Sequence, residues 1–310
     1  MRIMFMGTPD ISATCLDTMV KERLDIVAVV TGKDKPRGRG NVMTPTPTKS
    51  KAIEYGIPVY TPDTLRDDAF LALLSEISPD LIAVVAYGKI LPKSVLEFPR
   101  YGCLNAHVSL LPKYRGAAPM QRAIMEGERE TGVTVMYMDE GLDTGDILLS
   151  ESFPIGPTDD FETVHDRSAM LGGRLLSEAI KALEEGRAPR IPQDNSHATY
   201  AAKIEKADCK IDFTKPATEL DCIIRGVTPI PGAFAYLNGK MLKLNKAAVS
   251  DGSGKPGEVV FTEAKGEGYF LVACGEGALK VTSVIPEGKG RMSAGDFIRG
   301  RKIKEGDILT

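Results

Sequence analysis

The sequence predicts an α/β protein of two domains: a Rossmann-like N-terminal domain with a mostly parallel sheet, then a small OB-like β-barrel. The chain has 310 residues, more than one hydrophobic core usually organises. Apolar runs of strand length alternate with helical patterns in the first half, as in βαβ units. Beyond about residue 209, short alternating runs separated by glycines replace them. We therefore expect domains at residues 1–189 and 207–310, joined by a linker at 190–206.

The N-terminal elements follow one another in a regular rhythm. Helical patterns at residues 12–21, 49–55 and 69–77 lie between apolar strand-like runs, and residues 160–185 form the longest amphipathic helical stretch. Such a rhythm predicts a mostly parallel sheet covered by helices on both faces. Residues 32–47, rich in Pro, Gly and cations, interrupt it and are expected to form a long loop. The predicted strands are residues 2–6, 26–31, 57–60, 81–86, 104–107 and 133–138.

The C-terminal part has a different pattern of apolar residues. From residue 187 to about 209 periodicity fades, and Pro189, Pro192 and Asn195 break any regular element. Beyond this expected linker, five short strands with turn signals between them suit a small barrel of the OB type. They are residues 233–237, 242–245, 257–262, 269–274 and 278–283.

Composition narrows the function classes. With 43% hydrophobic and 26% charged residues, the chain is an ordinary globular protein, and no apolar run reaches the ~20 residues of a membrane span. A net charge of -3 argues against a nucleic-acid binder that is basic throughout. Five scattered cysteines without a CxxC pair predict neither disulfides nor a zinc site, so we expect a reduced, cytoplasmic protein.

Two segments carry the strongest chemical signal. Asn105 and His107 lie two residues apart at the end of a predicted strand, so both side chains should share one face. Asp143 follows the strand at 133–138, and ligands of open α/β sheets lie beyond the carboxyl ends of strands. An amide and an imidazole can stabilise an oxyanion, and an imidazole with a carboxylate can move protons. The three residues suffice to transfer a small acyl group to an amine.

These segments resemble one family. Asn105-Ala-His-Val-Ser-Leu-Leu-Pro112, Lys113-Tyr-Arg-Gly-Ala-Ala-Pro119 and Gly141-Leu-Asp-Thr-Gly-Asp146 together are similar to the folate-dependent formyltransferases. Over nearly its whole length, the chain is most similar to the branch that formylates methionyl-initiator-tRNA. The resemblance implies a 10-formyltetrahydrofolate donor and a formylated initiator tRNA as the product that starts translation.

The resemblance also implies roles for individual residues. Asn105, His107 and Asp143 would be catalytic, leaving Asp146 to cap its loop through bonds to backbone N–H groups. No metal is expected, because the three histidines are widely spaced and form no HxxxH pattern. The folate would lie between three loops that contain Tyr87, Gly88, Ile90, Leu91, Ser109, Leu110, Leu111, Pro112 and Asp139.

Two basic segments are candidates for tRNA contacts. Residues 33–51 carry six cations and a single acid, and the resemblance places the critical arginine at Arg39. The end of the chain is basic as well, and OB domains bind nucleic acids through electropositive grooves. A solvated, mobile insertion and a solvated surface are the plain alternatives. The predicted contacts are Lys35, Arg37, Arg39, Lys289, Arg291, Arg299, Arg301 and Lys302.

Three other functions share parts of this pattern. A formyltransferase with a small amine acceptor would use the same three residues without needing the basic segments. A formyltetrahydrofolate hydrolase would use water as the acceptor. A non-catalytic RNA-binding protein would keep the OB module but would not need the Asn, His and Asp. We expect a monomer by default.

Overall fold

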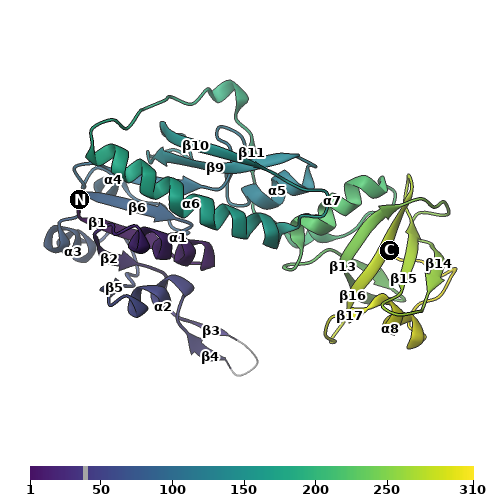
Figure 1. Cartoon of the computed structure of the whole chain (residues 1–310). Coiled ribbons are helices and arrows are strands. Elements are labelled where there is room, and N and C mark those ends of the chain that lie inside the picture. The colour runs from purple at the N-terminus through teal and green to yellow at the C-terminus, as the bar shows by residue number, and fades with distance from the viewer. Residues whose placement is uncertain (38–40) are drawn as a thin grey trace. The chain divides into compact units, whose positions relative to one another are not determined.

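The computed structural model describes residues 1–37 and 41–310 and divides into two compact units. The first consists of Met1–Pro119, Glu130–Pro154 and His165–Ala201. The second consists of Met120–Arg129, Ile155–Val164 and Ala202–Thr310. Two short segments that precede residue 189 in sequence thus pack with the C-terminal part (Figure 1).

A seven-stranded sheet organises the first unit, in the order β10-β9-β7-β6-β1-β2-β5. The five neighbouring strands β7, β6, β1, β2 and β5 are parallel to one another. Strand β9 is antiparallel to β7, and β10 is antiparallel to β9. The predicted mostly parallel sheet is confirmed. Strand β10 was not predicted, since half of its residues are exposed and no apolar alternation marks it. The strands are β1 (Ile3–Gly7), β2 (Ile26–Val30), β5 (Val59–Tyr60), β6 (Leu81–Val85), β7 (Cys103–His107), β9 (Glu130–Tyr137) and β10 (Ile147–Pro154).

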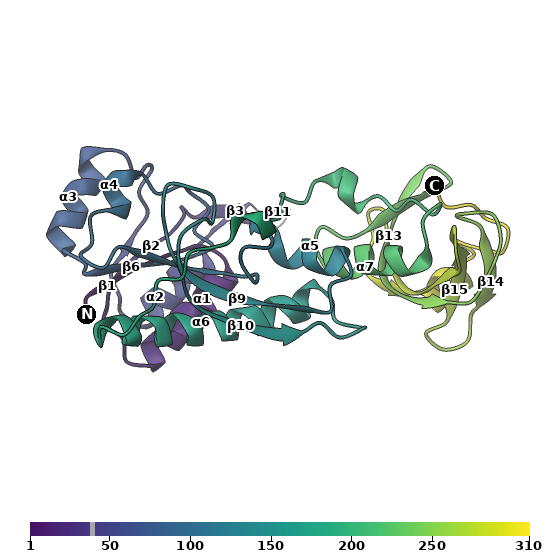
Figure 2. The same ribbon diagram turned by 90° about the horizontal axis from the view of Figure 1, so that it is seen from above.

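Helices cover both faces of this sheet (Figure 2). On one face α1 (Asp10–Lys21) packs closely against α6 (Phe161–Glu184), where a Cβ added to Gly173 would meet Thr18 at 2.8 Å. On the other, α3 (Asp68–Ile77) and α4 (Lys93–Leu96) bury Phe70, Leu74 and Val95 in a core with the strand residues. The Asp67 side chain caps α3 by accepting a bond from the Phe70 N–H.

The segment expected to be a long loop contains a two-stranded antiparallel ribbon, so that prediction was wrong in part. Its strands are β3 (Lys35–Arg37) and β4 (Val42–Thr44). Helix α2 (Pro47–Glu54) follows, beginning two residues earlier than expected. Thr46 caps it by accepting from the Lys49 N–H, and Pro47 has the fixed φ that suits a first helical position.

The second unit is built on an antiparallel sheet in the order β12-β13-β16-β15-β14. The last residues of the chain pair with both edges of this path, Leu309 with Leu237 and Ile308 with Glu258, and so close a small barrel. The predicted β domain is confirmed, although β13 and β16 are longer than expected. Its strands are β12 (Phe234–Leu237), β13 (Lys240–Ser250), β14 (Val259–Glu263), β15 (Tyr269–Ala273), β16 (Ala278–Pro286) and β17 (Met292–Ser293).

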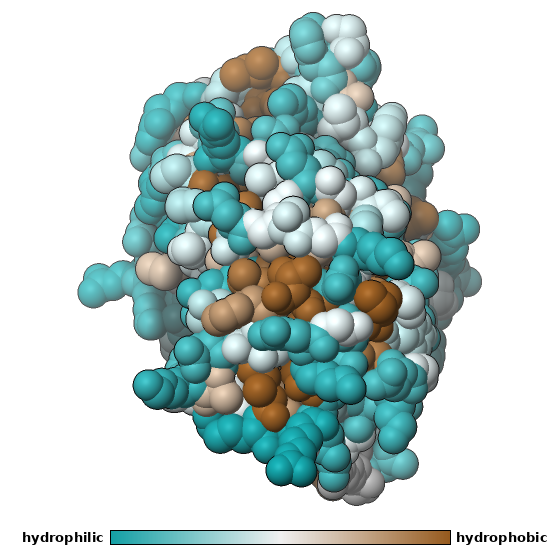
Figure 3. All heavy atoms as spheres, turned by 90° about the vertical axis from the view of Figure 1, so that its right-hand side faces the viewer, coloured by the Kyte–Doolittle hydropathy of each residue, from teal (hydrophilic) through white to brown (hydrophobic). Residues whose placement is uncertain are grey.

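Helices that the sequence pattern did not reveal complete this unit. They are α5 (Pro119–Met125), α7 (Ala217–Val227) and α8 (Ala294–Arg299). Leu220, Ile224 and Val227 of α7 are buried in the barrel core. Apolar side chains also gather on part of the surface seen in Figure 3, and Val249, Phe261 and Ile308 are among the exposed large apolar residues of this unit. No helix in the described part of the chain is both long and apolar enough to span a bilayer.

Candidate active site

Strand β7 carries the first two predicted catalytic residues in the middle of the sheet. Asn105 lies opposite Val84 of β6 and Met136 of β9, and His107 lies opposite Thr134. Because side chains alternate along a strand, those of Asn105 and His107 lie on the same face. The Asn105 side chain is half-buried, whereas His107 is only 6% exposed. The sheet therefore fixes both side chains on a rigid support.

Hydrogen bonding defines the state of His107. Its Nε2 lies 2.9 Å from the backbone carbonyl of Tyr114. A carbonyl can only accept, so Nε2 carries a proton and the other ring nitrogen is the one free to exchange protons. That atom, Nδ1, faces Asp143 with 3.6 Å to Oδ2, too far for a hydrogen bond. The ring is thus anchored on one side and open to a reacting group on the other.

Asp143 lies in the loop between β9 and β10. Its Oδ2 accepts a 2.8 Å bond from the Gly116 N–H, and its backbone is left-handed with φ of 54°. A left-handed conformation is unusual for a residue with a side chain and is found mostly where surrounding structure imposes it. Gly145 allows the loop to lie against β9, because a Cβ there would be 1.8 Å from the Tyr137 carbonyl oxygen.

The loop is capped by a different aspartate from the one predicted. Asp139 Oδ1 accepts bonds from the Gly141 N–H and the Thr144 hydroxyl, at 3.0 and 2.7 Å. Asp146 was expected to cap the loop, but its carboxylate lies 3.9 Å from Arg190 Nε. Asp139 precedes its donors by two and five residues, which suits a turn-capping side chain. Asp139 was also predicted to contact folate. One oxygen of its carboxylate is used in the two hydrogen bonds inside the loop.

Asn105 differs from His107 and Asp143 in its hydrogen bonding. Among the described residues, none forms a hydrogen bond with its side-chain amide. A half-buried amide usually satisfies its donors, so an open one beside His107 is available to a ligand. Amide, imidazole and carboxylate together offer two donors for an oxyanion and a route for protons.

The remaining predicted folate residues lie on two loops. After β6, Gly88 has φ of 80°, Leu91 is buried and Ile90 is 80% exposed. Tyr87 is buried, and its hydroxyl has no hydrogen-bond partner in the part of the chain that the structure describes. Burial raises the pKa of Tyr87 to about 12, which keeps the phenol neutral. The loop therefore presents Ile90 outward from an apolar base.

The second loop follows β7. Ser109 is fully buried, and its hydroxyl donates to the Lys113 carbonyl at 2.7 Å. Leu111 is buried, while Leu110 and Pro112 are half-buried. The Leu111 N–H donates to the Thr134 hydroxyl, which in turn donates to the Ser109 carbonyl. The side chain of Ser109 is thus used inside the protein and shapes the loop.

Two residues that support the site were not predicted. Arg115, on β8 (Arg115–Gly116), is 2% exposed and donates to Gln193 Oε1 and Asn195 Oδ1. Gln193 then donates to the carbonyls of Asp143 and Gly145, at 2.9 and 2.8 Å. Gln193 lies in the segment expected to be a linker, about 50 residues from the loop that it holds, so no local pattern could have revealed it.

Comparison with known proteins identifies a family for both parts of the chain. The model of a family described as "Formyl transferase" matches residues 1–180, and that of "Formyl transferase, C-terminal domain" matches residues 203–302. The chain belongs to the formyl transferase family. Among its relatives, the methionyl-tRNA formyltransferase of Pelotomaculum thermopropionicum is 46% identical over 312 residues, covering 100% of this chain and 98% of that protein. That of Syntrophus aciditrophicus is 47% identical over 309 residues, covering 99% and 98%.

Solved structures share the fold of this formyl transferase. The N-formyltransferase of Helicobacter canadensis, in complex with folinic acid and dTDP-3-aminofucose, has a TM-score of 0.66. It is 21% identical and covers 90% of this chain and 98% of its own. HypX of Aquifex aeolicus, in complex with tetrahydrofolic acid, has a TM-score of 0.65 at 20% identity, covering 100% of this chain and 50% of its own. At these identities the likeness concerns the fold alone.

The basic segment of this formyl transferase has fewer open cations than the sequence suggests. Lys33 pairs with Asp63, Lys49 pairs with Asp34 at 2.8 Å, and Lys51 pairs with Asp17 and Glu54. The remaining cations of residues 33–51 are the ones predicted to contact tRNA: Lys35, Arg37 and Arg39. Lys35 is exposed and Arg37 ends β3, whereas Arg39 lies outside the described residues.

The C-terminal cations also differ from one another. Arg299 donates to the carbonyls of Ala264 and Gly266 and to Asp296 Oδ1, so its guanidinium is used within the barrel. The other four are exposed, and none forms an ion pair within the described part of the chain. These four are Lys289, Arg291, Arg301 and Lys302.

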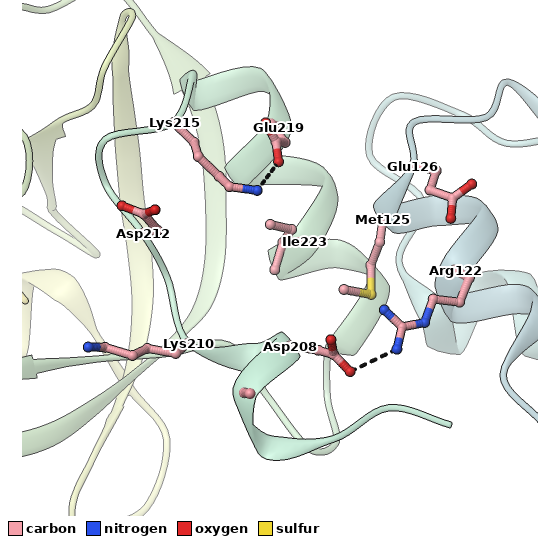
Figure 4. A pocket seen from close by; sticks show the side chains of 10 residues that line it. Arg122, Met125, Glu126, Asp208, Lys210, Asp212, Lys215, Glu219 and Ile223 are labelled. Atoms are coloured by element: carbon pink, nitrogen blue, oxygen red, sulfur yellow. Dashed lines mark hydrogen bonds and ion pairs between the residues drawn. The ribbon is translucent and has the colours of Figure 1, made fainter. Parts of the chain in front are cut away.

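A pocket of about 430 Å³ in the second unit contains none of the predicted site residues (Figure 4). It lies between α5, the short 3-10 helix at Lys206–Cys209, and α7. Arg122 bridges its walls, with bonds to Asp208 at 2.8 Å and to the Ala202 carbonyl at 3.1 Å. Lys215, just before α7, pairs with Glu219 in the first turn of that helix. These contacts attach α5 to the chain that enters the barrel, which gives the lining charges a structural role.

The other candidate metal or redox groups are accounted for structurally. His165 lies 3.3 Å from Asp10 and 3.0 Å from Asp166, while His197 lies 3.7 Å from Asp194. Within the described residues, no cluster of three or more His, Cys, Asp or Glu side chains could hold a metal. The five cysteines are free, and burial raises the pKa of both Cys15 and Cys103 to about 12, so these two thiols stay protonated.

Proposed function

We propose that this formyl transferase moves the formyl group of 10-formyltetrahydrofolate to the α-amino group of methionyl-initiator-tRNA, giving N-formylmethionyl-tRNA. The observation that carries the proposal is full-length similarity. At 45–46% identity, two named methionyl-tRNA formyltransferases align with 100% of the chain, including both domains. A transferase with a small acceptor would not need the exposed cations of the two basic segments.

The proposed chemistry uses the three grouped side chains. The neutral amine attacks the formyl carbon, and negative charge develops on the formyl oxygen. The open amide of Asn105 and a protonated His107 Nδ1 are the donors for that oxygen. Asp143 stabilises the imidazolium and, directly or through a water, moves the proton from the amine to the departing folate nitrogen. The Gly116 N–H keeps the Asp143 carboxylate in place during these steps.

We propose that the folate lies against the loops after β6, β7 and β9. The predicted contacts Tyr87, Gly88, Ile90 and Leu91 belong to the first loop. Exposed Ile90 would cover an apolar part of the ligand, while buried Tyr87 and Leu91 would support the loop from beneath. From the second loop, Leu110 and Pro112 are half-buried, so they can contribute directly, whereas Ser109 and Leu111 contribute backbone groups.

We propose that tRNA phosphates contact the ribbon β3–β4 and the exposed C-terminal cations. Lys35, Arg37 and Arg39 would supply the first surface. The second surface would consist of the exposed side chains of Lys289, Arg291, Arg301 and Lys302. Arg299 would stabilise the barrel instead of binding phosphate directly. Positive side chains against phosphates give affinity that depends on salt and fix the register of the bound nucleic acid.

The remaining parts of the proposal concern organisation. Residues 1–189 would form the catalytic domain and residues 207–310 the tRNA-binding domain. Residues 190–206 would both connect them and support the catalytic loop through Gln193. The proposed location is the cytoplasm, where translation starts, and the proposed state is a monomer without a metal.

A parallel acceptor assay tests the function. Labelled 10-formyltetrahydrofolate is offered with charged initiator tRNA, charged elongator methionine tRNA and small amines. Label on the initiator tRNA alone supports the proposal. Label on a small amine, or formate released without an acceptor, would leave the catalytic residues in place but replace the proposed acceptor. No turnover at all would favour a binding protein.

A further inference from the structure

A side-chain network outside the three proposed catalytic residues holds the loop that carries Asp143. Gln193 is its centre. The Nε2 of Gln193 donates to the carbonyl oxygens of Asp143 and Gly145, at 2.9 and 2.8 Å. Its Oε1 accepts from Arg115 Nε and Nη2, at 3.2 and 2.6 Å. Every hydrogen-bonding position of the amide is therefore used.

The chemistry of the partners fixes the orientation of this amide. Arginine can only donate and a backbone carbonyl can only accept, so the Gln193 oxygen must face Arg115 and its nitrogen must face the loop. Arg115 is itself held, since it is 2% exposed and also donates to Asn195 at 2.7 Å. A buried, fixed guanidinium thus orients the group that in turn orients the Asp143 loop.

The Asp143 loop needs this support. Asp143 has a φ of 54°, in the left-handed region that Asp enters more readily than most residues but that still depends on the surrounding structure. Gln193 binds the carbonyl of Asp143 itself and that of Gly145 two residues later. Gly116, which follows Arg115, donates its N–H to the carboxylate of Asp143. Strand β8 therefore positions Asp143 twice, through its backbone and through Gln193.

We propose that Gln193 is a positioning residue for formyl transfer, acting through Asp143. The inference rests on the proposed function and adds a residue to it. Without the two amide donors, the carbonyls of Asp143 and Gly145 lose partners and the loop can leave its left-handed conformation. The carboxylate then spends less time beside His107 Nδ1, now 3.6 Å away. Displacement of a catalytic group by about 1 Å can cost roughly a hundredfold in rate.

The test is a set of matched variants assayed for formyl transfer at saturating and limiting substrate. Gln193→Ala should lower kcat by about 10- to 100-fold while KM for both substrates stays within about threefold. Gln193→Glu should lose at least as much, because its carboxylate keeps the Arg115 contact but sets an acceptor against two carbonyls. Ser196→Ala alters the same segment at an exposed side chain whose hydroxyl bonds to Asp194 and not to Arg115 or the loop, so its kcat should stay within about threefold of wild type.

A double-mutant cycle separates positioning from a general structural role. In an Asp143→Asn background, Gln193→Ala should change the residual kcat by no more than about twofold, because the group it positions is already disabled. An undiminished effect in that background, or a wild-type kcat for Gln193→Glu, would overturn the inference. A wild-type protein that transfers no formyl group would instead refute the proposed function.

Discussion

Replacing Asn105 by alanine is the perturbation whose consequences can be worked out most fully. The Asn105 amide has no hydrogen-bond partner among the described residues, and the side chain is half-buried on a central strand. Its removal leaves no protein group unsatisfied. We therefore expect the free energy of unfolding to fall by about 1 kcal/mol or less. For a unit of this size that corresponds to a decrease in Tm of roughly 2–4 °C.

The effect on the reaction should be far larger. Loss of one oxyanion donor costs about 2.7–4 kcal/mol of transition-state stabilisation, or roughly 10²–10³ in kcat. Single-turnover transfer from saturating 10-formyltetrahydrofolate to charged initiator tRNA measures this loss directly, and thermal unfolding measures the cost in stability. Asn105→Asp keeps the size but places a negative charge near the developing one, so it should lose at least as much. A kcat within a few-fold of wild type, with a normal Tm, would remove Asn105 from the mechanism.

Three further predictions concern the loop, the tRNA surface and the second unit. Gly145→Ala would place its Cβ 1.8 Å from a backbone carbonyl, so the loop must move; we expect kcat to fall at least tenfold and stability by about 1–3 kcal/mol, measured by turnover and denaturation. Arg39→Ala should raise KM for tRNA and reduce its salt dependence while folate binding persists; equal loss of both in equilibrium titrations would indicate a misfolded domain instead. The Glu205 N–H and then Arg122 hold the pKa of Asp208 below its usual value. Because the pKa is lower in the folded state, ionised Asp208 contributes stability above the unfolded pKa, and this contribution is lost as the pH falls through the folded pKa. The stability advantage of wild type over Asp208→Asn should therefore shrink as the pH falls below about 3.9.

The sequence predicted what depends on local pattern. Strands β1, β2 and β6 are almost entirely apolar and buried, and such runs are recognisable without any partner. The position of Asn105 and His107 at one strand end followed from the alternation of side chains. The barrel strands were recognisable by alternation and glycine turns, although β13 and β16 are longer than predicted.

The features that the sequence did not predict depend on contacts distant in the chain. In the sequence, Gln193 is a polar residue between Pro192 and Asn195, which interrupt regular secondary structure. Only folding brings its side chain to the carbonyl of Asp143. Asp139 and Asp146 lie at either end of the loop that carries Asp143, and the sequence does not show which of them caps it. The geometry of the turn places Asp139, and not Asp146, within reach of the donors of the loop. The ribbon β3–β4 is short and polar, with Pro36 opposite Met43, so no apolar alternation marks it. In each case tertiary geometry, and not local preference, chose the outcome.

The central claim is that Asn105, His107 and Asp143 transfer a formyl group to charged initiator tRNA. The most direct test follows labelled formyl from 10-formyltetrahydrofolate onto charged initiator tRNA, for the wild type and for Asn105→Ala in parallel. We predict rapid label on the initiator tRNA with the wild type and a rate roughly 10²–10³ lower with the variant. Label on a small amine, or equal rates for the two proteins, would contradict the account.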